Sequence, residues 1–222
     1  MRSHIRESLG DNVMKARRSA LITRRIAVPT AIGVTATLLC TGIASADVSV
    51  DKTFTWSANW PSIGTVSPIS TEVLGSMVSP VPLGTPENSN VTVDIDTPPS
   101  VTQALINAGA ATVAGSGDAW ITVTDPNGTK ANIDVPLSGP SVAVPAAGSD
   151  LTAQATGVAQ FPGTFDTGTA IATLDADHVF ITLTPQDASG NPLGTVTVQL
   201  TLDPATQDTT LANVQVGTGS QG

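Results

Sequence analysis

The sequence predicts an all-β fold, an antiparallel immunoglobulin-like β-sandwich with one short helix. From residue 47 onward, runs of alternating apolar and polar residues recur about every 8–12 residues, and turn-forming residues separate them. The chain is rich in Thr, Val and Ala, and only 3% of its residues are aromatic. Because β-branched side chains fit a pleated surface, this composition favours strands over helices.

Ten segments carry the alternating pattern and are predicted to be strands. In chain order they cover residues 48–60, 90–96, 119–124, 129–137, 141–145, 151–160, 170–174, 178–185, 195–202 and 210–216. The residues Asp125-Pro-Asn-Gly128 join two of them with the chemistry of a hairpin turn. Residues 61–89 contain five prolines and are predicted to be loop and edge strand, because proline cannot donate to a sheet ladder.

One helix is predicted among the strands, at residues 100–108. Ser100 can cap its first turn, and Gly109 can end it because glycine tolerates a left-handed conformation. Residues 47–222 are long enough for one domain with its own core. They are predicted to form a single sandwich whose last residues, 217–222, are a short flexible tail.

The N-terminal segment, residues 1–46, is predicted to be a secretory signal peptide. Seven of the nine Lys and Arg residues precede residue 26, an apolar run follows from Ile26 to Cys40, and Ala44-Ser-Ala46 comes next. A basic segment, an apolar segment and an A-x-A site are the three parts of such a peptide. Cleavage is expected near Ala46 and Asp47, and the mature protein is expected to be extracellular or associated with the cell envelope.

Two other interpretations of this segment stay open. Cys40 would carry the anchor of a lipoprotein, although Leu39 stands where a small residue is usual. Arg24 and Arg25 would belong to a twin-arginine signal instead of an ordinary basic region. The apolar run has about 15 residues, short of the roughly 20 that a membrane helix needs, so no stable membrane insertion of the mature chain is expected.

The rest of the chain is strongly acidic. After residue 46 its basic residues are Lys52 and Lys130 alone, against sixteen Asp and Glu, which makes a formal charge of −14. Affinity for phosphates comes from Lys and Arg, so nucleic acid is excluded as a partner. The single cysteine is Cys40, so disulfides, thiol nucleophiles and Cys-ligated zinc are not expected in the mature chain.

Three segments carry a resemblance to other proteins. They are Ala108-Gly-Ala-Ala-Thr-Val-Ala-Gly115, Val142-Ala-Val-Pro-Ala-Ala-Gly148, and residues 186–212, which begin with Gln186-Asp-Ala-Ser-Gly-Asn-Pro-Leu-Gly194. With these motifs the mature chain resembles a family of uncharacterised, secreted, Thr/Val-rich domains of actinobacteria. The resemblance implies a scaffold without an assigned activity.

The resemblance also implies two cysteines that this chain lacks. They would stand in the first strand and before the Asp203-Pro204 turn, near Trp56 and Leu200. Both are absent together, so packing of Trp56 against the last strands is expected to replace a disulfide.

Two hydrolase motifs are incomplete. Phe165-Asp166-Thr-Gly168 matches the aspartic-protease signature, but that chemistry needs a second Asp of the same kind and the chain has no other such motif. His178 is the only His after residue 46, no GxSxG elbow accompanies it, and Gly115-Ser-Gly117 is predicted to be a flexible turn. The chain is therefore predicted not to be an enzyme, and a hydrolase using Asp166 or His178 is the less favoured alternative.

Oxygen-rich loops are the candidate metal sites. Asp187, Ser189 and Asn191 alternate in a Gly-containing loop, a pattern that suits calcium, although the Glu that completes an EF-hand loop is missing. The other interpretation is a set of solvated turn residues on an acidic protein, in which case no cofactor is bound.

Aromatic residues are the candidate binding residues. Phe54, Trp56 and Trp60 share one face of the first predicted strand and could form the stacking platform of a carbohydrate-binding module. In a chain with so few large residues, they could equally be the core. The predicted function is a non-catalytic binding or structural domain outside the cell, with a cell-wall or extracellular partner, and a carbohydrate-binding module is the alternative.

Overall fold

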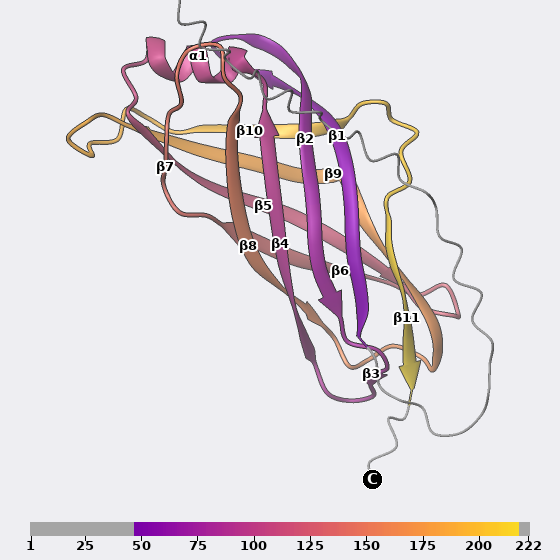
Figure 1. Ribbon diagram of the computed structural model, residues 1–222. Coiled ribbons are helices and arrows are strands. Elements are labelled where there is room, and N and C mark those ends of the chain that lie inside the picture. Colours follow the sequence, from indigo (N-terminus) through magenta and orange to yellow (C-terminus); the bar gives the residue numbers. More distant parts are fainter. Residues whose placement is uncertain (1–46, 218–222) are drawn as a thin grey trace, which may run out of the picture. The chain divides into compact units, whose positions relative to one another are not determined.

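The computed structural model describes residues 47–217, which contain eleven strands and one helix (Figure 1). The strands are β1 (Val48–Trp60), β2 (Gly64–Met77), β3 (Val81–Pro82), β4 (Glu87–Thr97), β5 (Thr112–Thr124), β6 (Lys130–Ser138), β7 (Val142–Ala143), β8 (Leu151–Phe161), β9 (Gly168–Gln186), β10 (Val196–Leu202) and β11 (Thr210–Gly217), and the helix is α1 (Pro99–Asn107). The predicted signal peptide and residues 218–222 of the predicted tail lie outside the described residues, so both stay predictions.

Eight strands close into a β-barrel. Around the barrel wall the order is β9-β10-β1-β2-β4-β8-β6-β5, and β5 then pairs with β9 again. This closing pair is antiparallel and extends over thirteen positions, from Thr112 opposite Gln186 to Thr124 opposite Ile171. The remaining strands extend this sheet: β11 pairs with the first half of β9, β3 pairs with β11, and β7 pairs with the first residues of β5.

The predicted immunoglobulin-like sandwich is therefore wrong, although the all-β class is confirmed. In a sandwich, two sheets face each other without backbone hydrogen bonds between them. Here the β5–β9 ladder joins the ends of the sheet, and closure removes the free edges that a sandwich keeps. Alternation with a period of two predicts strands with one buried face, and that pattern is the same in both architectures.

The strand β9 shows how the barrel is built. Residues 170–174 and 178–185, predicted as two strands, form one strand of 19 residues. Its register against β5 changes between the pairs Ala119–Val179 and Trp120–Asp175, so residues 176–178 form a bulge. Before the bulge β9 pairs with β11 and after it with β10, so one long strand serves two neighbours on the same edge.

The secondary structure of the proline-rich residues 61–89 also differs from the prediction. They contain β2, which is a full strand of the wall between β1 and β4 and not an edge strand. Pro68 lies where the β1–β2 register shifts, between the pairs Trp56–Ile69 and Ala58–Val66. A proline is tolerated there because the regular ladder is already interrupted.

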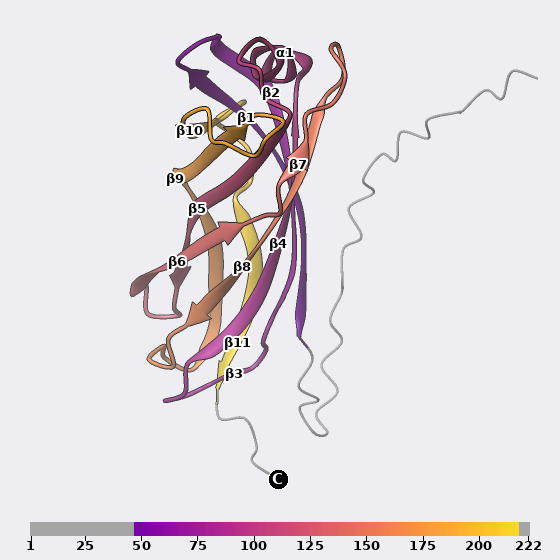
Figure 2. The ribbon, with the colours of Figure 1, turned by 90° about the vertical axis from the view of Figure 1, so that its left-hand side faces the viewer.

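The helix α1 lies at one end of the barrel (Figures 1 and 2). It begins at Pro99 and its N-cap is Pro98, with no side-chain cap, so Ser100 does not cap it as predicted. A proline is suited to the first turn because the N–H that it lacks would have no helical partner. Gly109 follows the helix with a φ of 78°, as predicted for a C-terminal glycine.

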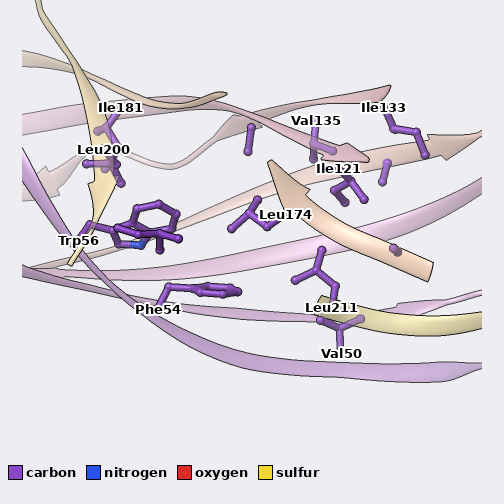
Figure 3. Packing of buried hydrophobic residues seen from close by; sticks show 14 of the residues in the cluster. Val50, Phe54, Trp56, Ile121, Ile133, Val135, Leu174, Ile181, Leu200 and Leu211 are labelled. Carbon is purple, nitrogen blue, oxygen red and sulfur yellow. The ribbon is translucent and has the colours of Figure 1, made fainter. Parts of the chain in front are cut away.

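The inward faces of the strands form one apolar core (Figure 3). Phe54 and Trp56 are each 1% exposed, and their ring centroids lie 5.8 Å apart. The Trp56 indole Nε1 donates a buried hydrogen bond to Thr71 Oγ1 at 2.8 Å. In the β1–β10 ladder Trp56 lies opposite Leu202 and Ala58 opposite Leu200, so Trp56 is buried beside the strand where the second cysteine was expected.

Candidate functional site

A cavity lies inside the barrel beside strands whose inward-facing residues are small. On β5 these residues are Gly115, Gly117 and Ala119, and on β8 they are Ala153 and Ala155. Alternate residues of a strand face the same side, so the short side chains leave adjacent positions unfilled. The space measures about 80 Å³. An eight-stranded barrel has room for its own side chains or for one small ligand.

The remaining lining of the cavity is mainly apolar. It includes Trp56, Trp60, Ile95, Leu174, Ile181 and Leu200, which come from strands all around the wall. Polar side chains in the lining, apart from the indole nitrogens, are Thr71, Thr97, Ser116 and Gln154. A lining of this composition favours apolar molecules and leaves a few polar groups to orient them.

Trp60, which borders this cavity, has an unpaired buried donor. Its side chain is 5% exposed, and its buried indole Nε1 has no hydrogen-bond partner. Leaving such a donor unsatisfied costs about 1–3 kcal/mol. Ser89 and Thr102 also hold unpaired buried hydroxyls, but neither lines the cavity. The Trp60 Nε1 is covered by neighbouring protein atoms, so the apolar lining, and not this donor, is what the cavity offers to a ligand.

The wall of the cavity is thin beside β8. The strands β6 and β8 are paired at Leu137–Gly157 and Ser138–Thr156. Beyond this junction Gly139 packs on the backbone of Gln154, and the chain then runs to β7, which pairs with β5. Pro140 and Val142 on one side, and Ala153 and Gln154 on the other, border both the cavity and a groove on the outer surface. These residues therefore form a wall that the two spaces share.

This outer groove is acidic. Glu72, Asp94 and Asp96 line it, in a space of about 500 Å³, and we call these three side chains the acidic rim. Glu72 lies opposite Asp94 in the β2–β4 ladder, and Gln154 Nε2 donates to Asp94 Oδ1 at 2.8 Å. Burial raises the pKa of Asp96, and the negative charge of Asp150 raises it further.

Neither lysine of the described chain pairs with the acidic rim. Lys52 Nζ lies 3.6 Å from Asp208 Oδ2, and Lys130 stands at the start of β6 beside the hairpin turn. The rim thus gathers negative charge without a cationic side chain to balance it.

The predicted sugar-stacking residues lie inside the barrel. Phe54, Trp56 and Trp60 are 1%, 1% and 5% exposed, so they offer no stacking surface to the outside. Trp56 and Trp60 line the cavity, however, and a molecule that entered it would meet their side chains.

The predicted calcium loop is a hydrogen-bonded turn between β9 and β10. Asp187 Oδ1 accepts from the backbone N–H of Ser189 at 2.8 Å and of Asn191 at 2.9 Å, and Oδ2 accepts from Asn191 Nδ2 at 3.0 Å. These bonds, above all those from Asn191, lower the pKa of Asp187. The Asp187 carboxylate therefore stabilises the turn. In the range 47–217, no three His, Cys, Asp or Glu side chains form a group that could hold a metal ion.

The residues of the hydrolase motifs make other contacts. Asp166 Oδ2 accepts from Asn127 Nδ2 at 2.6 Å, which links two loops. His178 Nδ1 lies 3.0 Å from Asp175 Oδ2, and its ring stacks on Trp120 with centroids 4.0 Å apart. The flexible turn predicted at Gly115-Ser-Gly117 is wrong, because these residues lie within β5.

The cavity itself was missed at the level of sequence, although a signal for it was present. Small residues alternate at 115, 117 and 119, and again at 153 and 155. Alternating small residues predict a thinly filled interior only if their strands line one barrel, and strand pairing decides that. No helix within residues 47–217 is long and apolar enough to cross a membrane.

Comparisons with other proteins identify the family of the chain. No curated protein and no solved structure matches it significantly. A family model does match, over residues 78–212, which include β3 and the strands from β4 to β10. Since this match covers more than half of the sequence, the chain belongs to DUF6801, a family of unknown function.

Proposed function

We propose that this chain is a secreted or cell-envelope-associated binding domain of actinobacterial type, without catalytic activity, whose barrel cavity holds a small and mainly apolar ligand. The observation that carries the proposal is the apolar cavity that the small inward-facing residues of β5 and β8 leave inside the barrel. A ligand with an apolar body would fill this space.

The chemistry of the cavity supports binding over catalysis. Removing apolar surface from water contributes about 25 cal/mol per Å², and the lining offers mainly apolar groups for this purpose. Among the described residues that line it there is no Asp, Glu or His, and the acidic rim lies on the outer side of the wall. Export is supported by the basic segment, the apolar run and the A-x-A site before Asp47.

A cavity-filling variant tests the ligand site. At Gly115 an added Cβ would lie 3.7 Å from Leu183 Cδ2, an ordinary contact, so Gly115→Ala occupies cavity space without a clash. We expect 1-octanol to change the tryptophan fluorescence of the full chain saturably, and Gly115→Ala to weaken this binding by about tenfold on steric grounds.

The control is Gly217→Ala, where an added Cβ meets nothing within 4 Å and which does not line the cavity. This variant should bind 1-octanol as the wild type does. If 1-octanol gives no saturable change, or if Gly115→Ala binds it equally well, the cavity is not a ligand site.

Fractionation of the native host tests the location. N-terminal sequencing of protein from the medium or from a cell-wall wash should begin near Asp47. A full-length chain that stays in the cytoplasm would contradict export.

A further inference from the structure

The chain between β6 and β8 covers the cavity on one side. Residues 140–150, which we call the strap, include β7 and run beside β8 towards the end of the barrel that carries α1 (Figures 1 and 2). Pro140 and Val142 of the strap line the cavity. We propose that the strap is a gate, which detaches from β5 to let the ligand into the cavity and then closes over it. This inference rests on the proposed function, since it concerns the route to the same site.

The strap is held by fewer contacts than the rest of the wall. Its strand β7 pairs with β5 at two positions, and the Val144 N–H donates to Ala111 O at 2.9 Å. By comparison, the β4–β8 ladder has eleven residue pairs. None of the residues 140–150 is buried. Local opening of a fold begins where few buried contacts and few backbone hydrogen bonds are lost, so the strap is the part of the cavity wall that opens most readily.

Both ends of the strap are fixed. Before it, the Gly139 N–H donates to Gly115 O at 3.1 Å, and an added Cβ at Gly139 would overlap the carbonyl oxygen of Gln154. After it, Leu151 begins β8 and is 4% exposed. A segment that is fixed at both ends and weakly held between them can move as a flap, while the β6–β8 junction stays paired.

The side chains of β7 suit this role. Val142 and its partner Val113 line the cavity, whereas the neighbouring pair, Thr112 and Ala143, does not. Opening therefore removes an apolar side chain from the lining and leaves a passage. Val142 is half-buried, and an apolar ligand in the cavity would cover more of it once the strap has closed. The bound ligand thus favours the closed strap.

A disulfide between β5 and β7 tests the gate. Thr112 and Ala143 are register partners, and the Cα atoms of such partners lie about 4.5–5.5 Å apart, within the span of a disulfide. We would compare the full chain carrying Cys40→Ser with the same chain carrying Thr112→Cys/Ala143→Cys as well, each under oxidising and reducing conditions. Stopped-flow tryptophan fluorescence measures the rates of 1-octanol binding and release, and a titration measures the Kd.

The lock should change rates and leave affinity alone. In the oxidised double-cysteine variant, binding and release should both slow about tenfold or more, because the strap cannot open. The Kd should stay the same, because the closed free and closed bound forms are unchanged. Reduction of the disulfide should restore both rates.

The matched control is Thr122→Cys/Asn132→Cys, also in the Cys40→Ser chain. Thr122 and Asn132 are register partners on β5 and β6, one half-buried and one exposed, as Thr112 and Ala143 are. Neither lines the cavity. This disulfide joins β5 to its other neighbour and leaves the strap free, so both rates should equal those of the Cys40→Ser chain.

Amide hydrogen exchange of the unmodified chain is a second measurement. The amide of Val144 should exchange clearly faster than the amides of the β4–β8 ladder, because opening of the strap breaks its bond to Ala111. Exchange at Val144 as slow as in that ladder would mean that the strap does not open.

The outcomes separate the gate from the ligand site. If the oxidised lock leaves the rates unchanged, or if both disulfides slow binding equally, the strap is not the gate and the cavity site stands. A changed Kd in the oxidised lock would also contradict a gate, because the strap would then shape the site itself. If 1-octanol does not bind the Cys40→Ser chain saturably, the proposed function fails.

Discussion

Two tryptophans of β1 differ in how their indole groups are satisfied. Trp56 Nε1 donates to Thr71 Oγ1, whereas Trp60 Nε1 has no partner, although both side chains are buried and both line the cavity. Trp56 therefore has the contacts of a structural residue, whereas the indole donor of Trp60 stays unsatisfied.

The substitution Trp56→Ala tests the structural role. We expect a loss of about 3–5 kcal/mol in the free energy of unfolding, because a fully buried indole is removed and Thr71 loses its donor. Denaturant unfolding measures it. The control is Trp120→Ala, because Trp120 is half-buried on the outer side of β5; this substitution should lower the free energy of unfolding clearly less. Equal losses in the two variants would show that packing of Trp56 does not replace a disulfide.

Asp187 is a second residue with a defined structural role, and its role depends on pH. Its pKa in the folded chain lies below the ordinary value of 3.8, because donors of its own turn bind the ionised form. Its stabilising contribution is thus present above that value and is lost as the pH falls through the folded pKa. The wild type should be more stable than Asp187→Asn at pH 7, and the difference should narrow towards pH 3.

The substitution Asp96→Asn should change the free energy of unfolding in the opposite direction to Asp187→Asn. Burial and Asp150 raise the pKa of Asp96, so its ionised form disfavours the folded state. This variant should be more stable than the wild type at pH 7, and its advantage should vanish once the pH falls well below 3.8. Urea unfolding at several pH values measures the stability of each variant relative to the wild type. If both substitutions stabilise the protein at pH 7, or both destabilise it, the opposite pKa shifts of Asp187 and Asp96 are contradicted.

At the scale of elements, the β6–β8 junction is the shortest ladder of the barrel wall. Two residue pairs hold it, and at Gly157 an added Cβ would overlap the carbonyl oxygen of Pro136 and approach Leu137 Cδ2 to 2.9 Å. The glycine thus allows the close approach of β6 and β8, and Gly139 packs in the same way on the backbone of Gln154.

The substitution Gly157→Ala should push β6 away from β8. We expect a loss of about 1–3 kcal/mol in the free energy of unfolding, because the obstructing atom is backbone and cannot rotate away. Amide hydrogen exchange at residues 137 and 138 should accelerate. Gly115→Ala, which meets no such obstacle, is the control, and equal stability of the two variants would contradict a tight junction at Gly157.

At the scale of the molecule, closure depends on β5 and β9. Each has paired neighbours on both edges, whereas β3 and β7 are short strands at the ends of the sheet. The family match begins at residue 78, so β1 and β2, which complete the wall between β10 and β4, lie outside it.

Hydrogen exchange of the whole chain tests this closure. Amides of β5 from Ile121 to Val123 and of their β9 partners should exchange slowest, near the global unfolding rate, and those of β3 and β7 should exchange fastest. Fast exchange along the β5–β9 ladder would mean that the barrel is open at this pair.

The sequence by itself determined most elements of this protein. Alternation located nine of the strands, although it divided β9 into two and left β2 and β3 in a segment predicted to be loop and edge strand, and Gly109 marked the end of the helix. The charge after residue 46 predicts that nucleic acid is not a partner. These properties depend on neighbours within a few residues, so a local pattern records them.

Only the tertiary structure decided the architecture and the candidate site. Whether β5 pairs with β9 depends on residues far apart in the sequence, for example Val113 and Pro185, and the period of two is the same in a sandwich and in a barrel. Gly115 and Ala153 form a cavity only because closure places them in one interior, and Glu72 and Asp94 line one outer groove only because β2 pairs with β4. Sequence alternation reports which face of a strand is buried, and long-range pairing decides what that face encloses.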